Sequence, residues 1–161
     1  GLSTWRLAQA YPASFVIGID QSADRLERQT GWPGEPPANC ILVRADLVDY
    51  WRLLLAAGIR PQQHYLLYPN PWPKKSQLSR RWQGHAVFPT VLALGGRIEC
   101  RSNWKIYIDE FAVAVTQLSN QPACCELDRA VGQQVMHHLG VARNNVGALL
   151  VAYRGVFEET A

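Results

Sequence analysis

The sequence predicts one α/β domain: a mostly parallel sheet with helices on both faces. Short apolar runs alternate with amphipathic segments, and these runs are continuous, which is typical of strands buried on both faces. The chain has 161 residues, 48% of them hydrophobic and 18% charged, so it can fill one core and has little room for a second. This composition excludes intrinsic disorder. No apolar run approaches the ~18–20 residues that cross a bilayer, so we expect a soluble protein.

The first half of the chain contains five predicted elements. Serine or threonine caps the first helix, Ser22 caps the second, and Gly58 closes the third. The proline- and glycine-rich stretch 31–37 is a surface loop. The elements are a helix over 3–11, a strand over 15–19, a helix over 22–29, a strand over 40–44 and a helix over 47–57.

The second half continues the alternation of strands and helices. Pro69 interrupts a strand, Gly95 and Gly96 end a helix, and a long amphipathic helix follows with its apolar residues on one face. The elements are a strand over 64–68, a helix over 84–94, a strand over 97–101, a helix over 104–118, a helix over 126–139 and a strand over 146–153.

Polar side chains follow four of the predicted strands. They are Asp20, Asp46, Asn70 and Asn103. In α/β sheets ligands bind at the carboxyl ends of the strands, and a carboxylate there can accept hydrogen bonds from ribose hydroxyls. Taken alone, Asp20 is equally consistent with a helix cap, but four polar strand ends predict a common crevice.

The positive charges are unevenly distributed. The formal net charge is +3, yet no acidic residue lies between Asp49 and Glu99, an interval with seven lysines and arginines. Scattered residues such as Arg52 fit an ordinary solvated surface. The cluster over 74–81 instead predicts a basic face that binds a polyanion.

The cysteines and histidines give weaker signals. Four cysteines, two of them adjacent, match neither a disulfide scaffold nor a zinc knuckle. Free thiols in a reducing cytoplasm are the favoured interpretation, and a metal site with His137 or His138 is the minor alternative. We expect His64 to be a partly exposed edge residue, and His85 to be a weak candidate for a phosphate contact.

The tryptophans divide into two groups. Core packing is the expectation for Trp5, Trp51 and Trp104. Trp72 lies between two prolines at a strand end, where base stacking or loop shaping is favoured over burial.

The segment YPNPWPKK, over 68–75, is followed by Arg80 and Arg81. It resembles the FPDPWPKK…KRR segment of bacterial tRNA (guanine-N7-)-methyltransferases. The FVIGID run over 15–20 is similar to the family's second strand. The glycine pair at 95–96 with SNW over 102–104 and Tyr107 resembles the family's GG…TDW..Y segment. The resemblance extends from residue 1 to about residue 111.

This resemblance implies a Rossmann-like fold and a cytoplasmic enzyme that uses S-adenosylmethionine to methylate N7 of a guanine in tRNA, at the family's usual site, guanine 46. It also implies that residues 1–161 form a single methyltransferase domain whose chain starts within the cofactor loop. The family's first strand, normally central in the sheet, is then missing, and we expect the sheet to lose its middle.

The resemblance also implies roles for individual residues. Asn70 occupies the position of the family's catalytic aspartate, and Asn103 replaces a second aspartate. Metal ligands are not implied. The implied cofactor-binding residues are Gly1, Asp20, Asp46, Leu47 and Asn70. The implied substrate-binding residues are Lys74, Asn103 and Thr160, and those contacting RNA are Lys75, Ser76, Arg80 and Arg81.

Two other functions remain open from the sequence. Asn70, Pro71 and Trp72 are similar to the motif of enzymes that methylate exocyclic amino groups of flipped bases. Alternatively, the basic residues and interleaved tryptophans could serve a catalytically weak RNA-binding module. A nicotinamide enzyme is disfavoured because the chain has no complete GxGxxG segment.

Overall fold

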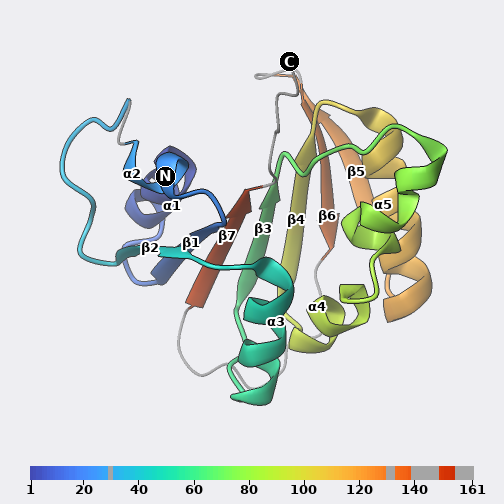
Figure 1. Cartoon of the computed structure of the whole chain (residues 1–161), viewed down its shortest axis with the longest axis horizontal. Coiled ribbons are helices and arrows are strands. Elements are labelled where there is room, and N and C mark those ends of the chain that lie inside the picture. The colour runs from blue at the N-terminus through green and yellow to red at the C-terminus, as the bar shows by residue number, and fades with distance from the viewer. Residues whose placement is uncertain (29–30, 130–132, 139–148, 155–161) are drawn as a thin grey trace.

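A seven-stranded sheet in the order β2-β1-β7-β3-β4-β6-β5 runs through the molecule (Figure 1). The computed structural model describes residues 1–28, 31–129, 133–138 and 149–154. Four strands lie where the sequence predicts them, within a residue or two. These are β1 (Phe15–Asp20), β2 (Cys40–Arg44), β3 (Gln63–Leu67) and β4 (Arg97–Ser102).

The centre of the sheet is complete, contrary to the expectation that it would be missing. The strand β7 (Leu149–Arg154) lies between β1 and β3 and pairs in parallel with both. Together with β2 and β4 these form five mutually parallel strands. A segment from the end of the sequence therefore occupies the place that the resemblance assigns to a strand preceding residue 1.

The other end of the sheet is an antiparallel hairpin of β5 (Ala123–Asp128) and β6 (Gln133–His138). The sequence predicts a helix over 126–139, and that prediction is wrong. The exposed ladder of β4 offers backbone hydrogen bonds to β6, and this tertiary pairing outweighs the local preference for helix. A left-handed residue, Asn120 (φ 56°), ends the preceding helix and turns the chain back.

Helices cover both faces of the sheet, as the sequence predicts (Figure 1). The helix α1 (Leu2–Ala10) packs on one face, where Gly18 of β1 lets it approach closely. A Cβ at Gly18 would lie 2.2 Å from Thr4 Oγ1. The short α2 (Ala23–Glu27) follows β1. The other face carries α3 (Leu47–Ala56), α4 (Phe88–Leu94) and α5 (Lys105–Ser119).

The main core lies between this second helical layer and the sheet. Its largest buried side chains are aromatic, and Phe88 of α4 meets Phe111 of α5 edge to face with ring centroids 5.2 Å apart. Trp51 of α3 is fully buried, as expected. Trp104 is not: 44% of it is exposed at the start of α5.

The predicted helix over 84–94 is shorter than expected. Its first part consists of turns, because Pro89 lacks an N–H and is tolerated only in the first turn of α4. Two 3-10 helices precede it, η1 (Lys75–Arg80) and η2 (Trp82–Gly84). These short turns place the residues after β3 beside the carboxyl edge of the sheet.

His64 is a core residue and not the edge residue expected. It is fully buried, and its Nε2 makes a 2.9 Å hydrogen bond with the carbonyl of Gly95. Desolvation lowers the pKa of His64 to about 4, so the neutral ring is the form that fits the core.

The cysteine thiols are unpaired in the structure. Cys100 is buried, whereas Cys124 and Cys125 lie exposed on β5. Within the described ranges, no three His, Cys, Asp or Glu side chains gather in a way that could hold a metal ion. The described helices also include none long and apolar enough to span a membrane.

Candidate functional site

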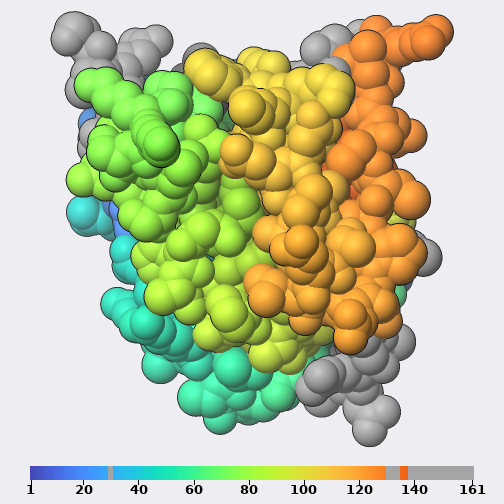
Figure 2. Space-filling view, turned by 90° about the vertical axis from the view of Figure 1, so that its right-hand side faces the viewer, coloured from blue at the N-terminus to red at the C-terminus, as the bar shows by residue number. Residues whose placement is uncertain are grey.

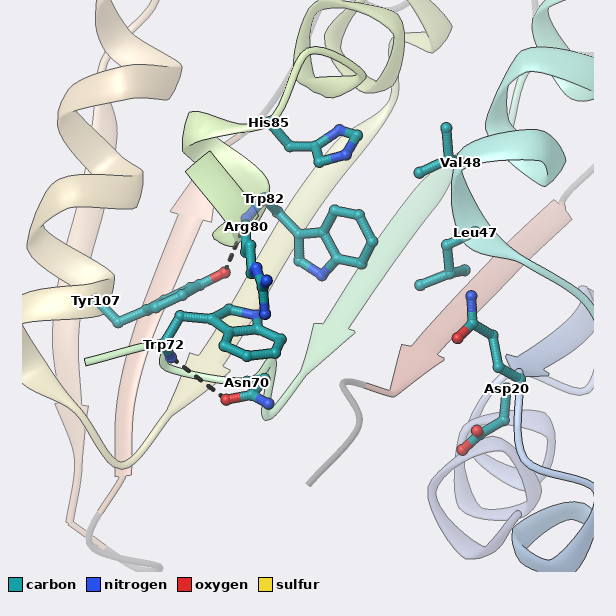
Figure 3. A pocket seen from close by; sticks show the side chains of 10 residues that line it. Asp20, Leu47, Val48, Asn70, Trp72, Arg80, Trp82, His85 and Tyr107 are labelled. Atoms are coloured by element: carbon teal, nitrogen blue, oxygen red, sulfur yellow. Dashed lines mark hydrogen bonds between the residues drawn. The ribbon is translucent and has the colours of Figure 1, made fainter. Parts of the chain in front are cut away.

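A pocket of about 270 Å³ lies at the carboxyl edge of the parallel strands (Figure 3). Its walls come from segments that are distant in the sequence: the end of β1, the start of α3, the chain between β3 and α4, and the start of α5. The lining residues are Asp20, Gln21, Leu47, Val48, Asn70, Trp72, Arg80, Trp82, His85 and Tyr107.

Asp20 closes β1 and supplies the acidic group of the pocket. Only 5% of the residue is exposed. Its Oδ1 accepts a 2.9 Å hydrogen bond from Ser22 N and lies 3.1 Å from the guanidinium of Arg25. These two contacts fix the carboxylate, while Oδ2 has no hydrogen-bond partner among the described residues. One acceptor oxygen is thus held in place and left available.

Asp46 has a structural role beside the pocket. Its Oδ1 caps α3 by accepting from Val48 N at 2.8 Å and Asp49 N at 3.3 Å, and its Oδ2 accepts from Gln21 Nε2. Asp46 does not line the pocket, but the residues that it positions do. Leu47 and Val48 then form an apolar wall directly after the cap.

Asn70 and Trp72 enter the pocket from a loop with unusual backbone geometry. Tyr68 (φ 54°) and Trp72 (φ 41°) both adopt left-handed conformations, which cost energy for residues with a Cβ. The Oδ1 of Asn70 accepts from Trp72 N at 3.3 Å (Figure 3). The loop therefore orients its own amide and indole groups toward the cavity.

Arg81 holds this loop from inside the protein. Its Nε and one terminal nitrogen both donate to the carbonyl of Trp72, at 3.2 and 3.1 Å, and the other terminal nitrogen pairs with Glu110 of α5. Because only 5% of Arg81 is exposed, it is not on the surface that an RNA contact requires. The expectation of an RNA contact is corrected for this residue.

Arg80 points the other way and lines the pocket. Its guanidinium carbon lies 5.0 Å from the centre of the Trp72 ring, a cation–π arrangement. Adjacent arginines thus have opposite positions, one inside the core and one stacked on the pocket's tryptophan. Figure 3 shows Arg80 over Trp72 on the side of the pocket opposite Leu47.

Aromatic side chains complete this wall. Trp82 packs edge to face against Trp51 with centroids 5.0 Å apart, and its backbone N donates to the hydroxyl of Tyr107 at 3.4 Å. Burial raises the pKa of Tyr107 well above its ordinary value, so the hydroxyl stays protonated. Trp82 also packs against the ring of His85, with ring centroids 5.9 Å apart.

The sequence did not identify the following lining residues as part of a pocket: Gln21, Val48, Trp82, His85 and Tyr107. Tyr107 was visible as part of the resembling segment. The clustering of Trp82 and His85 a short distance after Trp72 was also a signal, but their facing direction depends on the turns of η2, which the sequence does not reveal.

Other predicted residues lie apart from the pocket lining. Lys74, Lys75 and Ser76 are exposed in and next to η1, and Asn103 is exposed after β4. Gly1 is the N-cap of α1, where a Cβ would meet Trp32. Thr160 lies outside the described residues. Figure 2 shows η1, α4 and α5 together on one face of the molecule, with the green segment that contains η1 in the upper part of that face.

Part of the chain is similar in sequence to known proteins. No family model matches the chain. The chain is 28% identical over 117 residues to proteins of Bordetella parapertussis and Bordetella bronchiseptica, each named tRNA (guanine-N(7)-)-methyltransferase. This match covers 66% of the chain and 43% of each relative, so the chain spans less than half the length of these curated relatives.

A solved structure supports the fold. The crystal structure of SMU.776, named a "putative methyltransferase" and complexed with SAH, matches with a TM-score of 0.51 and 12% identity. The match covers 86% of this chain and 49% of that one. A Rossmann-like α/β fold is therefore confirmed. The chain is thus similar in sequence to part of the two Bordetella proteins and shares its fold with SMU.776.

Proposed function

We propose that this chain carries the catalytic site of an S-adenosylmethionine-dependent methyltransferase that acts on N7 of a guanine in tRNA. The observation that carries the proposal is the convergence of Asp20, Leu47 and Asn70 on one pocket at the carboxyl edge of the sheet. This edge is where α/β folds bind their ligands. The names of the Bordetella relatives and of SMU.776 agree with this activity.

The pocket residues fit the adenosine part of this cofactor. Asp20 has an oriented oxygen without a partner among the described residues, and a vicinal diol needs such an acceptor. Leu47 and Val48 provide an apolar surface for a flat base. When bound, S-adenosylmethionine supplies a methyl group on a positively charged sulfur, ready for displacement.

Methyl transfer to guanine N7 requires little acid–base catalysis from the protein. Guanine N7 has a lone pair and no proton, so no residue has to remove one. The protein must align the base with the methyl group and exclude water. Trp72 offers a stacking surface, and the carbonyl of Asn70, which has two lone pairs, can accept from the guanine amino edge as well as from Trp72 N.

Nucleoside analysis of tRNA incubated with the purified protein and S-adenosylmethionine tests this activity. We expect 7-methylguanosine. Methylated exocyclic amines would instead favour the alternative suggested by the Asn70–Trp72 motif. Absence of any methylated nucleoside, with tRNA binding retained, would identify an RNA-binding module and contradict the proposal. Mapping of the modified nucleotide tests whether it is guanine 46.

Replacement of Asn70 separates positioning from charge. Asn70→Ala removes the group that orients the base and is expected to lower kcat/KM about 10- to 100-fold. Asn70→Asp keeps an acceptor for Trp72 N and adds a negative charge beside a base that becomes cationic, so we expect kcat to rise about tenfold. Single-turnover methylation measures both. An Asn70→Asp variant as slow as Asn70→Ala would contradict the charge argument.

The exposed lysines of the basic cluster over 74–81 provide the tRNA contact in this proposal. Lys74→Ala combined with Lys75→Ala removes two charges without touching the pocket lining. We expect the salt dependence of tRNA binding, as log Kd against log salt, to lose a slope of about 1.5–2. The control is Arg6→Ala with Arg52→Ala, exposed arginines on α1 and α3. An equal loss of slope in both double variants would remove the case for a localised tRNA surface.

A further inference from the structure

His85, which the sequence suggests only as a weak candidate for a phosphate contact, is a pocket residue. It follows η2, is partly buried, and lines the cavity. Its Nδ1 accepts a 3.1 Å hydrogen bond from Val87 N. Because a backbone N–H can only donate, Nδ1 carries no proton, and the proton of the neutral ring is on Nε2. The structure thus fixes which nitrogen of His85 is the donor.

Two contacts hold this ring in place. The bond from Val87 N anchors one side, and Trp82 packs against the ring with an interplanar angle of 64°. The Nε2 group has no hydrogen-bond partner within the part of the chain that the structure describes. Such a fixed donor in a mostly aromatic and aliphatic wall is suited to one acceptor atom on a bound ligand.

The position of His85 distinguishes between the two ligands of the proposed function. In Figure 3, His85 and Val48 lie at one end of the pocket, and Asp20 and Asn70 lie at the other. Leu47 and Val48 lie between Asp20 and His85, so a base attached to a ribose at Asp20 would find an apolar surface that leads toward His85. The substrate base, in contrast, is assigned to Asn70 and Trp72, far from this end.

We propose that His85 recognises the adenine of the cofactor by donating from Nε2 to a ring nitrogen. Adenine presents acceptors at its ring nitrogens and a donor at its amino group, so a donor selects the ring nitrogens. Asp46 is one of the cofactor-binding residues that the resemblance implies, but its oxygens are engaged with α3 and Gln21. His85 instead provides the polar contact that sets the register of the base. This inference rests on the proposed cofactor.

Two substitutions separate the two nitrogens of the ring. His85→Asn places an acceptor near the position of Nδ1 for Val87 N and removes the donor at Nε2. His85→Gln keeps a donor near the position of Nε2 and removes the acceptor for Val87 N. We expect calorimetry with S-adenosylhomocysteine to show an affinity about two- to twelvefold weaker for the Asn variant. The Gln variant is expected to retain most of the wild-type affinity.

Deaza analogues then identify the partner atom. S-adenosylhomocysteine with a C–H at position 1, 3 or 7 of adenine removes one acceptor at a time. One analogue is expected to bind wild type about two- to twelvefold more weakly, and to bind His85→Asn with no additional loss. His137→Asn, on β6 in contact with Glu126, is the control and is expected to bind like wild type.

The outcomes separate this inference from the proposed function. Wild-type protein that does not bind S-adenosylhomocysteine overturns both. The role of His85 alone is overturned if His85→Asn binds S-adenosylhomocysteine as tightly as wild type does. It is also overturned if each deaza analogue loses the same affinity for wild type and for His85→Asn.

Discussion

Replacing Arg81 with alanine is expected to lower the free energy of unfolding by about 3 kcal/mol. The substitution leaves the partly buried carbonyl of Trp72 without the two donors that it now has and removes the partner of Glu110. The side chain of Glu110 is 41% exposed and can be hydrated again. The expected loss of unfolding free energy is therefore at the low end of what breaking a buried ion pair costs. Urea denaturation followed by tryptophan fluorescence measures the change.

The neighbouring arginine is the matched control. Arg80→Ala removes the same side chain from an exposed position, where it loses one cation–π contact worth about 0.5–1 kcal/mol. Arg81→Lys is expected to rescue little, because an ammonium cannot reproduce the forked donation to one carbonyl together with the pair to Glu110. If Arg81→Ala and Arg80→Ala destabilised the protein equally, Arg81 would not be the residue that holds the loop.

This pair of arginines illustrates why part of the site could not be predicted from the sequence. Both belong to one basic cluster, and composition assigns them the same role. The turn between η1 and η2 decides which one enters the core. A residue with left-handed geometry, such as Trp72, also gives no signal in the sequence, since it depends on the contacts that hold it.

The strands and their polar ends were predictable for a physical reason. Buried parallel strands require continuous apolar runs, and the runs before Asp20 and Asn70 supply them. Strands that run in parallel bring their ends to one edge, so these two residues reach a common pocket. Asn103 follows the same rule at β4 but lies exposed beyond the lining.

Pairing between distant segments was the part that local patterns did not determine. The strand β7 has an apolar sequence that fits any buried position, and only its two partners place it at the centre of the sheet. The hairpin of β5 and β6 likewise depends on the open edge of β4. In both cases a hydrogen-bonding partner far away in the sequence selected the structure.

Substitution of Asp20 is expected to have the largest effect on cofactor binding. Asp20→Ala removes the only acidic side chain that lines the pocket in the described part of the chain, and with it the acceptor for a ribose diol. Loss of two charge-assisted hydrogen bonds is expected to weaken S-adenosylhomocysteine binding about 100- to 1000-fold. Asp20→Asn retains one acceptor oxygen, so we expect an intermediate loss of about tenfold. Calorimetry measures both.

The control for Asp20 is Asp49→Asn, an exposed carboxylate in the first turn of α3 that does not line the pocket. Its affinity is expected to equal that of wild type, which excludes a general effect of net charge. Because Asp20 also pairs with Arg25 and accepts from Ser22 N, the Asn variant matters most: it keeps the size of the side chain and an acceptor for Ser22 N. A folded Asp20→Asn protein with undiminished affinity would mean that the ribose does not bind at the end of β1, and the orientation of the cofactor along Leu47 toward His85 would have to be abandoned with it.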